Sequence, residues 1–348
     1  MREIRIGNSV IGKDSPVFLI AEMSANHNQS FEDAVAIIRA AKEAGADAVK
    51  LQTYTPDTIT IDSDKQYFRI KGGLWDGENL YNLYKKAYTP WEWQPKLKKI
   101  ADELGIILFS TPFDKTAVDF LEEMNVPAYK VASFELVDLP LIEYIATKGK
   151  PVIMSVGMAT LGEIEEAVNA ARNAGAEQIA LLKCTSAYPA PPQEINLKTI
   201  PHLARAFDVV AGLSDHTTGI AVPVASVSLG AKIIEKHFTL SRARGGPDAA
   251  FSLEPAEFKA MAEAIRTAEK AIGKVHYGLT AAEEQGRSFR RSLFAVKDIK
   301  RGEIFTEDNV RSIRPGQGLP PKYIKKILGK KAARDIEKGT PIDWDMVG

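Results

Sequence analysis

Short apolar runs rich in β-branched residues alternate with amphipathic stretches along most of the chain. The intervening stretches have the 3.6-residue period of a helix, and many end at a glycine that can cap a helix C-terminus. Eight alternations of strand and helix predict a (β/α)8 TIM barrel. The eight predicted strands lie at residues 17–21, 47–52, 106–110, 128–133, 151–156, 179–184, 209–214 and 232–238.

A doubly wound open sheet is the alternative for such an alternation. The dinucleotide-binding form of that fold has the motif Gly-x-Gly-x-x-Gly after its first strand. Here the first predicted strand is followed by EMSANHN at residues 22–28, which lacks this glycine pattern. The sequence therefore favours the barrel.

The alternation ends near residue 273, and the chain has a different texture from Phe289 onward. Short strand-like pieces there alternate with the turn signals KRGE and EKGT. About 60 residues are close to the lower limit for independent folding, so we expect this part to pack on the barrel or on another subunit. We predict a barrel domain at 1–278, a linker at 279–288 and a small C-terminal domain at 289–348.

Charge and cysteine content point to a small-molecule partner in a reducing compartment. The 348 residues include 45 basic and 45 acidic side chains, so no net field favours nucleic acid or a membrane surface. The single cysteine, Cys184, excludes an intrachain disulfide framework. The N-terminus lacks the apolar core of a signal peptide, and no stretch reaches the roughly 20 apolar residues of a membrane span. We therefore predict a cytoplasmic protein.

Polar side chains end all eight predicted strands. Barrel enzymes have their active sites at the carboxyl ends of the strands, so these side chains are expected to meet at one mouth. A water-filled polar mouth without chemistry is the alternative. The residues at the strand ends are Glu22, Lys50, Gln52, Ser110, Thr111, Lys130, Ser133, Ser155, Thr185, Ser186, Ser214, Asp215, His216, Glu235, Lys236 and His237.

The kinds of residue at the mouth suggest two chemical functions. Lys50 and Lys130, with the neighbouring hydroxyls, can hold a small phosphorylated or carboxylated anion. His216 and His237 end the last two strands, where two imidazoles can share a divalent ion such as manganese, magnesium or cobalt. His27 is a weaker third ligand candidate. By strand periodicity Lys236 points away from Glu235 and His237, and we expect it to be structural.

Several motifs resemble the sialic acid synthase family of phosphoenolpyruvate-dependent sugar condensing enzymes. The C-terminal segments at 292–310 and 313–319 resemble the antifreeze-like (SAF, β-clip) domain of those enzymes. In that family the domain swaps across a homodimer and lends an arginine to the partner's site. The motifs are AEMSANHN (21–28), GADAVKLQTY (45–54), STPFD (110–114), YKVAS (129–133), KCTSAYP (183–189), GLSDHT (212–217), EKHFTL (235–240) and GPDAAFSLEP (246–255).

Within the family, the segment IKGGLWDGENLYNLY at 70–84 is similar to the branch that makes pseudaminic acid. The sialic acid branch usually has glycine at the position of Gln29 and histidine at that of Ala249. The resemblance implies condensation of phosphoenolpyruvate with 2,4-diacetamido-2,4,6-trideoxy-L-altrose and water, giving pseudaminic acid and phosphate. An N-acetylneuraminic or legionaminic acid synthase is the alternative within the family.

Two alternatives lie outside the family. A metal-dependent barrel aldolase or phosphohydrolase could use the same histidines and anion site. A binding protein that acts through its antifreeze-like domain is disfavoured, because segments such as KDIKRGE are strongly charged.

The resemblance also implies roles for individual residues. A divalent ion on His216 and His237 would polarise the sugar aldehyde, and Glu22 and Glu235 are candidates for the base. Phosphoenolpyruvate would be held by Lys50, Thr111, Lys130, Ser133, Ser155, Ser186 and Ser214. The sugar would face Tyr188, Asp248 and Arg314, with Arg314 coming from the other subunit.

Overall fold

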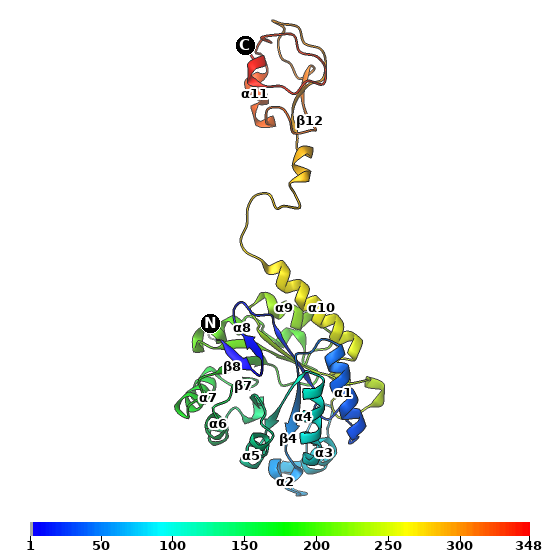
Figure 1. The fold of residues 1–348 in the computed structure, drawn as a ribbon, viewed down its shortest axis with the longest axis vertical. Coiled ribbons are helices and arrows are strands. Elements are labelled where there is room, and N and C mark those ends of the chain that lie inside the picture. The colour runs from blue at the N-terminus through cyan, green and yellow to red at the C-terminus, as the bar shows by residue number, and fades with distance from the viewer. Residues whose placement is uncertain (1–2) are drawn as a thin grey trace. The chain divides into compact units, whose positions relative to one another are not determined.

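The computed structural model describes residues 3–348 and divides the chain into two compact units (Figure 1). The first unit ends at Gly273 and the second is Lys274–Gly348. Met1 and Arg2, the start of the predicted barrel domain, lie outside the described residues. The three-part division with a linker at 279–288 stays a prediction.

The first unit contains a closed barrel of eight parallel strands, which confirms the predicted fold. Each strand pairs with the next along the chain, and the last pairs with the first. The register places Glu22 beside both Lys50 and His237, so side chains from three strands start from the same level of the mouth. The strands are β3 (Phe18–Glu22), β4 (Ala48–Thr53), β5 (Ile107–Pro112), β6 (Tyr129–Val131), β7 (Val152–Ser155), β8 (Ile179–Cys184), β9 (Val210–Asp215) and β10 (Ile233–His237).

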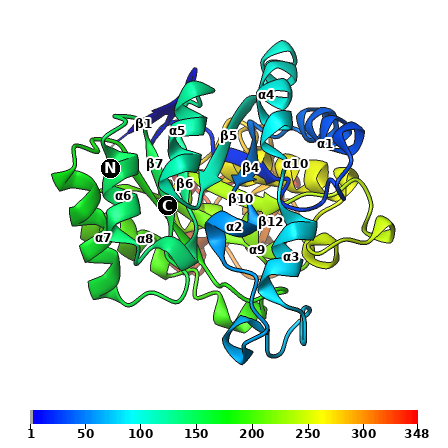
Figure 2. The same cartoon turned by 90° about the horizontal axis from the view of Figure 1, so that it is seen from below.

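Helices surround the barrel, as the view in Figure 2 shows. Polar residues begin several of them: Ser30 accepts from the amide of Asp33 in α1, and Thr160 and Glu163 form a reciprocal capping box in α7. The long connection after β4 holds the short helices α2 (Pro56–Ile59) and α3 (Leu80–Ala87). The other helices are α1 (Phe31–Glu43), α4 (Gln94–Glu103), α5 (Lys115–Glu123), α6 (Leu139–Ala146), α7 (Leu161–Asn173), α8 (Thr199–Phe207), α9 (Ala221–Ser228) and α10 (Pro255–Ile272).

A hairpin that the apolar pattern did not predict precedes the barrel. It consists of β1 (Ile4–Ile6) and β2 (Ser9–Ile11), which pair in antiparallel fashion. Ile4, Ile6 and Ile11 are buried in the same core cluster as residues of the barrel strands. The hairpin therefore extends the hydrophobic core of the first unit.

The second unit has a hydrophobic core of its own, which includes Leu293, Phe305 and Ile327. Its regular elements are the antiparallel strands β11 (Ser292–Ala295) and β12 (Val310–Ile313) and the single-turn helix α11 (Ile324–Ile327). Within residues 3–348, no helix has both the length and the apolar character needed to cross a membrane.

Candidate active site

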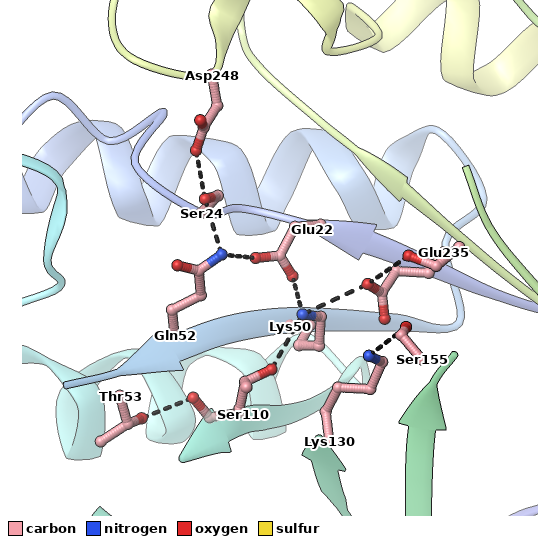
Figure 3. Close-up of polar contacts among 12 residues, drawn as sticks. Glu22, Ser24, Lys50, Gln52, Thr53, Ser110, Lys130, Ser155, Glu235 and Asp248 are labelled. Atoms are coloured by element: carbon pink, nitrogen blue, oxygen red, sulfur yellow. Dashed lines mark hydrogen bonds and ion pairs between the residues drawn. The ribbon is translucent and has the colours of Figure 1, made fainter. Parts of the chain in front are cut away.

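Lys50 lies between two buried carboxylates at the mouth of the barrel (Figure 3). Its Nζ is 2.8 Å from Oε2 of Glu22 on β3 and 3.4 Å from Oε1 of Glu235 on β10. It also donates a hydrogen bond of 3.1 Å to Oγ1 of Thr111 on β5. The ends of four strands thus meet at one charged cluster.

The two carboxylates of this cluster differ in their affinity for protons. Burial raises the pKa of Glu22 to about 7, although the neighbouring Lys50 opposes the shift. Burial also acts to raise the pKa of Glu235, but Lys50 and Lys130 outweigh it and hold that pKa below its usual value. Oε2 of Glu235 is buried and has no hydrogen-bond partner among residues 3–348. Near neutral pH, Glu235 is therefore a carboxylate with an unused acceptor, while Glu22 titrates.

The second lysine of the mouth, Lys130 on β6, is buried with no carboxylate of residues 3–348 within ion-pair distance. Its Nζ donates to Oγ of Ser155 at 2.6 Å and to the carbonyl oxygen of Val131 at 2.9 Å, and it has no ion-pair partner among residues 3–348. Burial lowers its pKa, while Glu235 opposes that shift. A buried ammonium group without an anion is costly, so this position is suited to an anionic ligand.

The hydroxyls of Ser133 and Ser186, two of the predicted site residues, both lie close to Gly157. The amide of Gly157 donates to Oγ of Ser133 at 3.1 Å. A Cβ atom on Gly157 would lie only 2.7 Å from that oxygen and even closer to Oγ of Ser186. Only glycine leaves room for both hydroxyls here, beside a backbone amide. Such a group of small donors suits a phosphate or carboxylate.

The imidazoles of His216 and His237 lie side by side, with ring centroids 5.3 Å apart. Nδ1 of His216 is 3.2 Å from the carbonyl oxygen of Thr185, which favours a proton on Nδ1 and leaves Nε2 free to bind a metal. Nδ1 of His237 is buried and has no hydrogen-bond partner in the described part of the chain. Burial lowers the pKa of His237 well below its usual value, so its ring is neutral, as a metal ligand must be.

The two histidines fit a divalent ion only as part of its coordination shell. In the described part of the chain, no three His, Cys, Asp or Glu side chains are grouped to hold a metal. The remaining ligands would have to be substrate or water oxygens, as is usual for a catalytic site with open positions. His27 does not fit as a third ligand, because its ring nitrogens contact Thr89 and the amide of Gln29.

A chain of hydrogen bonds connects Glu22 to Asp248, one of the residues predicted to face the sugar. Nε2 of Gln52 donates to Oε1 of Glu22 at 3.0 Å and to Oγ of Ser24 at 2.9 Å. Ser24 in turn donates to Oδ2 of Asp248, which also accepts from the amide of Ala25 at 3.3 Å. The carboxylate of Asp248 is thereby held at the mouth (Figure 3).

The remaining predicted residues divide into two groups. Ser214 lies within the cluster and donates to Oε1 of Glu235 at 3.2 Å, and the ring of Tyr188 lies 4.5 Å from that of His216. Arg314 belongs to the second unit, where it follows β12 and is exposed. Its contribution to a partner's mouth stays a prediction. Lys236 faces away from the mouth, as expected, and pairs with Asp215.

Sequence reasoning missed some members of the site. Ser24 lies in the turn after β3, with a φ of 44°, so strand periodicity does not place its side chain beside Glu22. Gly157 has no sequence signal, because its role depends on two serines from the segments that follow β6 and β8. From the sequence, Cys184 serves only to exclude an intrachain disulfide, yet its Sγ lies 3.7 Å from Nδ1 of His216. Burial acts to raise the pKa of this thiol, but His216 outweighs it and lowers the pKa to about 7.

Comparison with known proteins identifies the family of the chain. The model of the NeuB family matches residues 37–277, and the model of the SAF domain matches residues 290–348. The chain belongs to the NeuB family.

Similar members of the NeuB family include two named pseudaminic acid synthases. The protein from Campylobacter jejuni (strain 81-176) is 48% identical over 97% of both chains. The protein from Helicobacter pylori is 46% identical over 95% of this chain and 98% of its own. Among solved structures, the spore coat polysaccharide biosynthesis protein SpsE of Bacillus subtilis is 37% identical with a TM-score of 0.68, covering 100% of this chain and 99% of its own.

Proposed function

We propose that this chain condenses phosphoenolpyruvate with 2,4-diacetamido-2,4,6-trideoxy-L-altrose and water, giving pseudaminic acid and inorganic phosphate. The observation that supports this most strongly is the unpaired, buried ammonium of Lys130 on the same mouth as the two imidazoles. It would provide an anion site beside the proposed metal site. The similarity to two pseudaminic acid synthases over nearly the whole chain supports the choice of sugar.

Two lysines and five hydroxyls at the mouth form what we call the anion cradle, which would hold phosphoenolpyruvate. In this proposal Lys50 and Lys130 supply positive charge, and the hydroxyls supply short hydrogen bonds to the carboxylate and phosphate. Because the cradle is buried, these interactions are stronger than they would be in water. The hydroxyls are those of Thr111, Ser133, Ser155, Ser186 and Ser214.

The sugar would bind with its aldehyde beside the imidazoles and its polar groups toward Tyr188 and Asp248. A divalent ion such as manganese, magnesium or cobalt, held by His216 and His237, would supply Lewis-acid polarisation of the aldehyde oxygen. C3 of phosphoenolpyruvate would then form a bond to the aldehyde carbon, and water would add to C2, the carbon that carries the phosphate ester, before phosphate leaves from C2.

The two buried carboxylates would handle the protons of this reaction. Glu235 is ionised near neutral pH and has a free oxygen, so it is suited to take a proton from the attacking water. Glu22 has a pKa of about 7 and can hold or release a proton at working pH. Lys50 contacts both groups and stabilises whichever of them is charged.

We also propose that the active enzyme is a domain-swapped homodimer in the cytoplasm, with Arg314 of each copy completing the mouth of the other. In support, the loops after β6 and β7 expose large apolar side chains directly beside cradle residues. Phe134, next to Ser133, is 59% exposed, and Met158, next to Gly157, is 63% exposed. Apolar surface at this position is suited to contact with another chain.

Mixing inactive variants tests the swapped arrangement. Arg314→Ala and His237→Ala should each be inactive alone. After subunit exchange, some dimers hold one site with both defects and one with neither, so activity should return to at most about half per mixed dimer. An inactive mixture, with exchange shown by mass labelling, would place Arg314 outside the partner's site.

Phosphate release tests the proposed reaction. Purified protein with a divalent metal should release phosphate only when phosphoenolpyruvate and the sugar are both present, in amounts equal to the nine-carbon acid formed. Phosphate release from phosphoenolpyruvate alone would instead indicate a phosphohydrolase.

A further inference from the structure

The connection between β4 and α4 reaches the loop after β10 through Trp75. Its indole Nε1 donates a hydrogen bond of 3.2 Å to the carbonyl oxygen of Pro247, 172 residues away in sequence. Its ring also lies 5.7 Å from that of Tyr188, at an angle of 51°. Trp75 is half-buried. The side chain is thus fixed from two directions next to residues of the proposed sugar side.

Trp75 is the outer member of an aromatic wall made of Trp75, Tyr188 and Phe251. Tyr188 lies 4.5 Å from the ring of His216 and 5.2 Å from that of Phe251. Phe251 lies 4.8 Å from the ring of His237. The wall therefore begins at the two imidazoles and continues to Trp75, with Tyr188 between them.

This order gives the two ends of a bound open-chain sugar different neighbours. The aldehyde carbon must lie at the imidazole pair, so the opposite end of the carbon chain extends away from it. Two features near the imidazoles could contact that end: the carboxylate of Asp248, which is held by Ser24 and the amide of Ala25, and the aromatic wall.

The indole of Trp75 can offer this end of the sugar only apolar contact. Indole has a single donor and no acceptor, and that donor is used by the carbonyl of Pro247. A methyl group that packs against the ring would leave water without losing any hydrogen bond. A hydroxymethyl group in the same place would give up hydrogen bonds to water without gaining a partner from the indole.

We infer that Trp75 is a specificity-determining residue that packs on the C6 methyl group of a 6-deoxy amino sugar and disfavours a hydroxyl at C6. This inference rests on the proposed function, since it concerns the sugar of that reaction. It adds a substrate contact from the segment at 70–84, outside the strand ends that form the rest of the site.

The test compares kcat/KM for 2,4-diacetamido-2,4,6-trideoxy-L-altrose and for its C6-hydroxylated counterpart. Wild type should prefer the 6-deoxy sugar by about 10- to 100-fold, the range over which an apolar subsite distinguishes such groups. Trp75→Ala should lose most of this preference, mainly because its kcat/KM for the 6-deoxy sugar should be lower. Trp75→Phe, which keeps an apolar ring, should retain most of it, and the KM for phosphoenolpyruvate should not change.

Tyr67→Ala is the matched control, because Tyr67 precedes Trp75 in the same connection and is 79% exposed. Tyr67→Ala should leave kcat/KM unchanged for both sugars. Thermal melting should show that all variants fold. If Trp75→Ala lowers kcat/KM for both sugars by the same factor, the specificity role is overturned while the proposed reaction stands. The same conclusion follows if kcat/KM of wild type is equal for the two sugars. A wild type that turns over neither sugar overturns the proposed function and this inference with it.

Discussion

The ammonium group of Lys236 lies 2.5 Å from Oδ2 of Asp215, and neither side chain is exposed to solvent. Lys236 also donates to the carbonyl oxygen of Thr217, while Asp215 accepts from the amide and hydroxyl of Thr217 at 3.2 and 2.9 Å. These contacts fix the residues on both sides of His216 and the residue just before His237. The ion pair therefore orients the two imidazoles from behind the mouth.

Removing the positive charge of this pair should destabilise the protein strongly. Lys236→Met leaves the carboxylate of Asp215 buried without a counter-charge, and we expect the free energy of unfolding to fall by about 3 to 5 kcal/mol. Urea titration measures the loss. The double variant Lys236→Met/Asp215→Asn should recover part of it, because asparagine is neutral and still accepts from Thr217. A single variant as stable as wild type would mean that the pair contributes nothing.

Lys130 should matter for phosphoenolpyruvate far more than for the sugar. A charge-assisted hydrogen bond contributes about 1.5 to 3 kcal/mol, so Lys130→Met should weaken binding of phosphoenolpyruvate roughly 10- to 100-fold. Calorimetric titration with phosphoenolpyruvate alone measures this directly. Lys150→Met is the control, since Lys150 pairs with Glu122 and is not part of the mouth. Unchanged affinity in Lys130→Met would place the anion elsewhere.

Metal binding should depend on His237. His237→Ala removes one of two neighbouring imidazoles, and we expect weaker binding of Mn²⁺ in calorimetric titration and loss of condensation, with the melting temperature little changed. A chelator should have the same effect on wild-type activity. His202→Ala, an exposed histidine of α8, should bind Mn²⁺ normally. Full activity in chelator would exclude a Lewis-acid role for a bound ion.

Glu135 should make stability depend on pH. Burial raises its pKa from 4.5 to about 7, and its Oε2 is buried without a hydrogen-bond partner from the residues that the structure describes. The folded state therefore holds this proton more tightly than the unfolded state, so the group's contribution to stability becomes less favourable as pH rises from about 4.5 to 7. Glu135→Gln should raise the melting temperature by a few degrees at about pH 8 and by less at about pH 5.

The exposed Glu123 provides the control for this pH experiment. Glu123→Gln should shift the melting temperature little, and equally at both pH values. If Glu135→Gln gives the same shift at both pH values as well, the Glu135 carboxyl does not titrate as proposed.

The barrel could be predicted from sequence because its signal is local. Each buried strand is a short apolar run, and each amphipathic helix repeats its apolar face every 3.6 residues. The polar strand ends could be placed at one mouth for the same reason, since topology alone brings the carboxyl ends of parallel strands together. Thus Glu22, Lys50 and Glu235 were expected near one another, and they form one cluster.

Contacts between distant segments could not be predicted in this way. The hydrogen bond from Trp75 to Pro247 depends on the path of a long connection, which has no repeating pattern. The packing of two serines against Gly157 depends on side-chain positions in two separate segments, which follow β6 and β8. Even the run at 128–133 was read as one strand, whereas β6 ends at Val131 and Ser133 begins a 3-10 turn.

The most direct test of the central claim is the kcat/KM of wild type for three sugars, with phosphoenolpyruvate and a divalent metal in excess. The three are 2,4-diacetamido-2,4,6-trideoxy-L-altrose, the sugar that gives N,N'-diacetyllegionaminic acid, and N-acetylmannosamine, with products identified by mass and by NMR. The account predicts that the first exceeds the other two by at least about tenfold and gives phosphate and pseudaminic acid in equal amounts. A higher value for either of the others, or phosphate release that does not require a sugar, would contradict it.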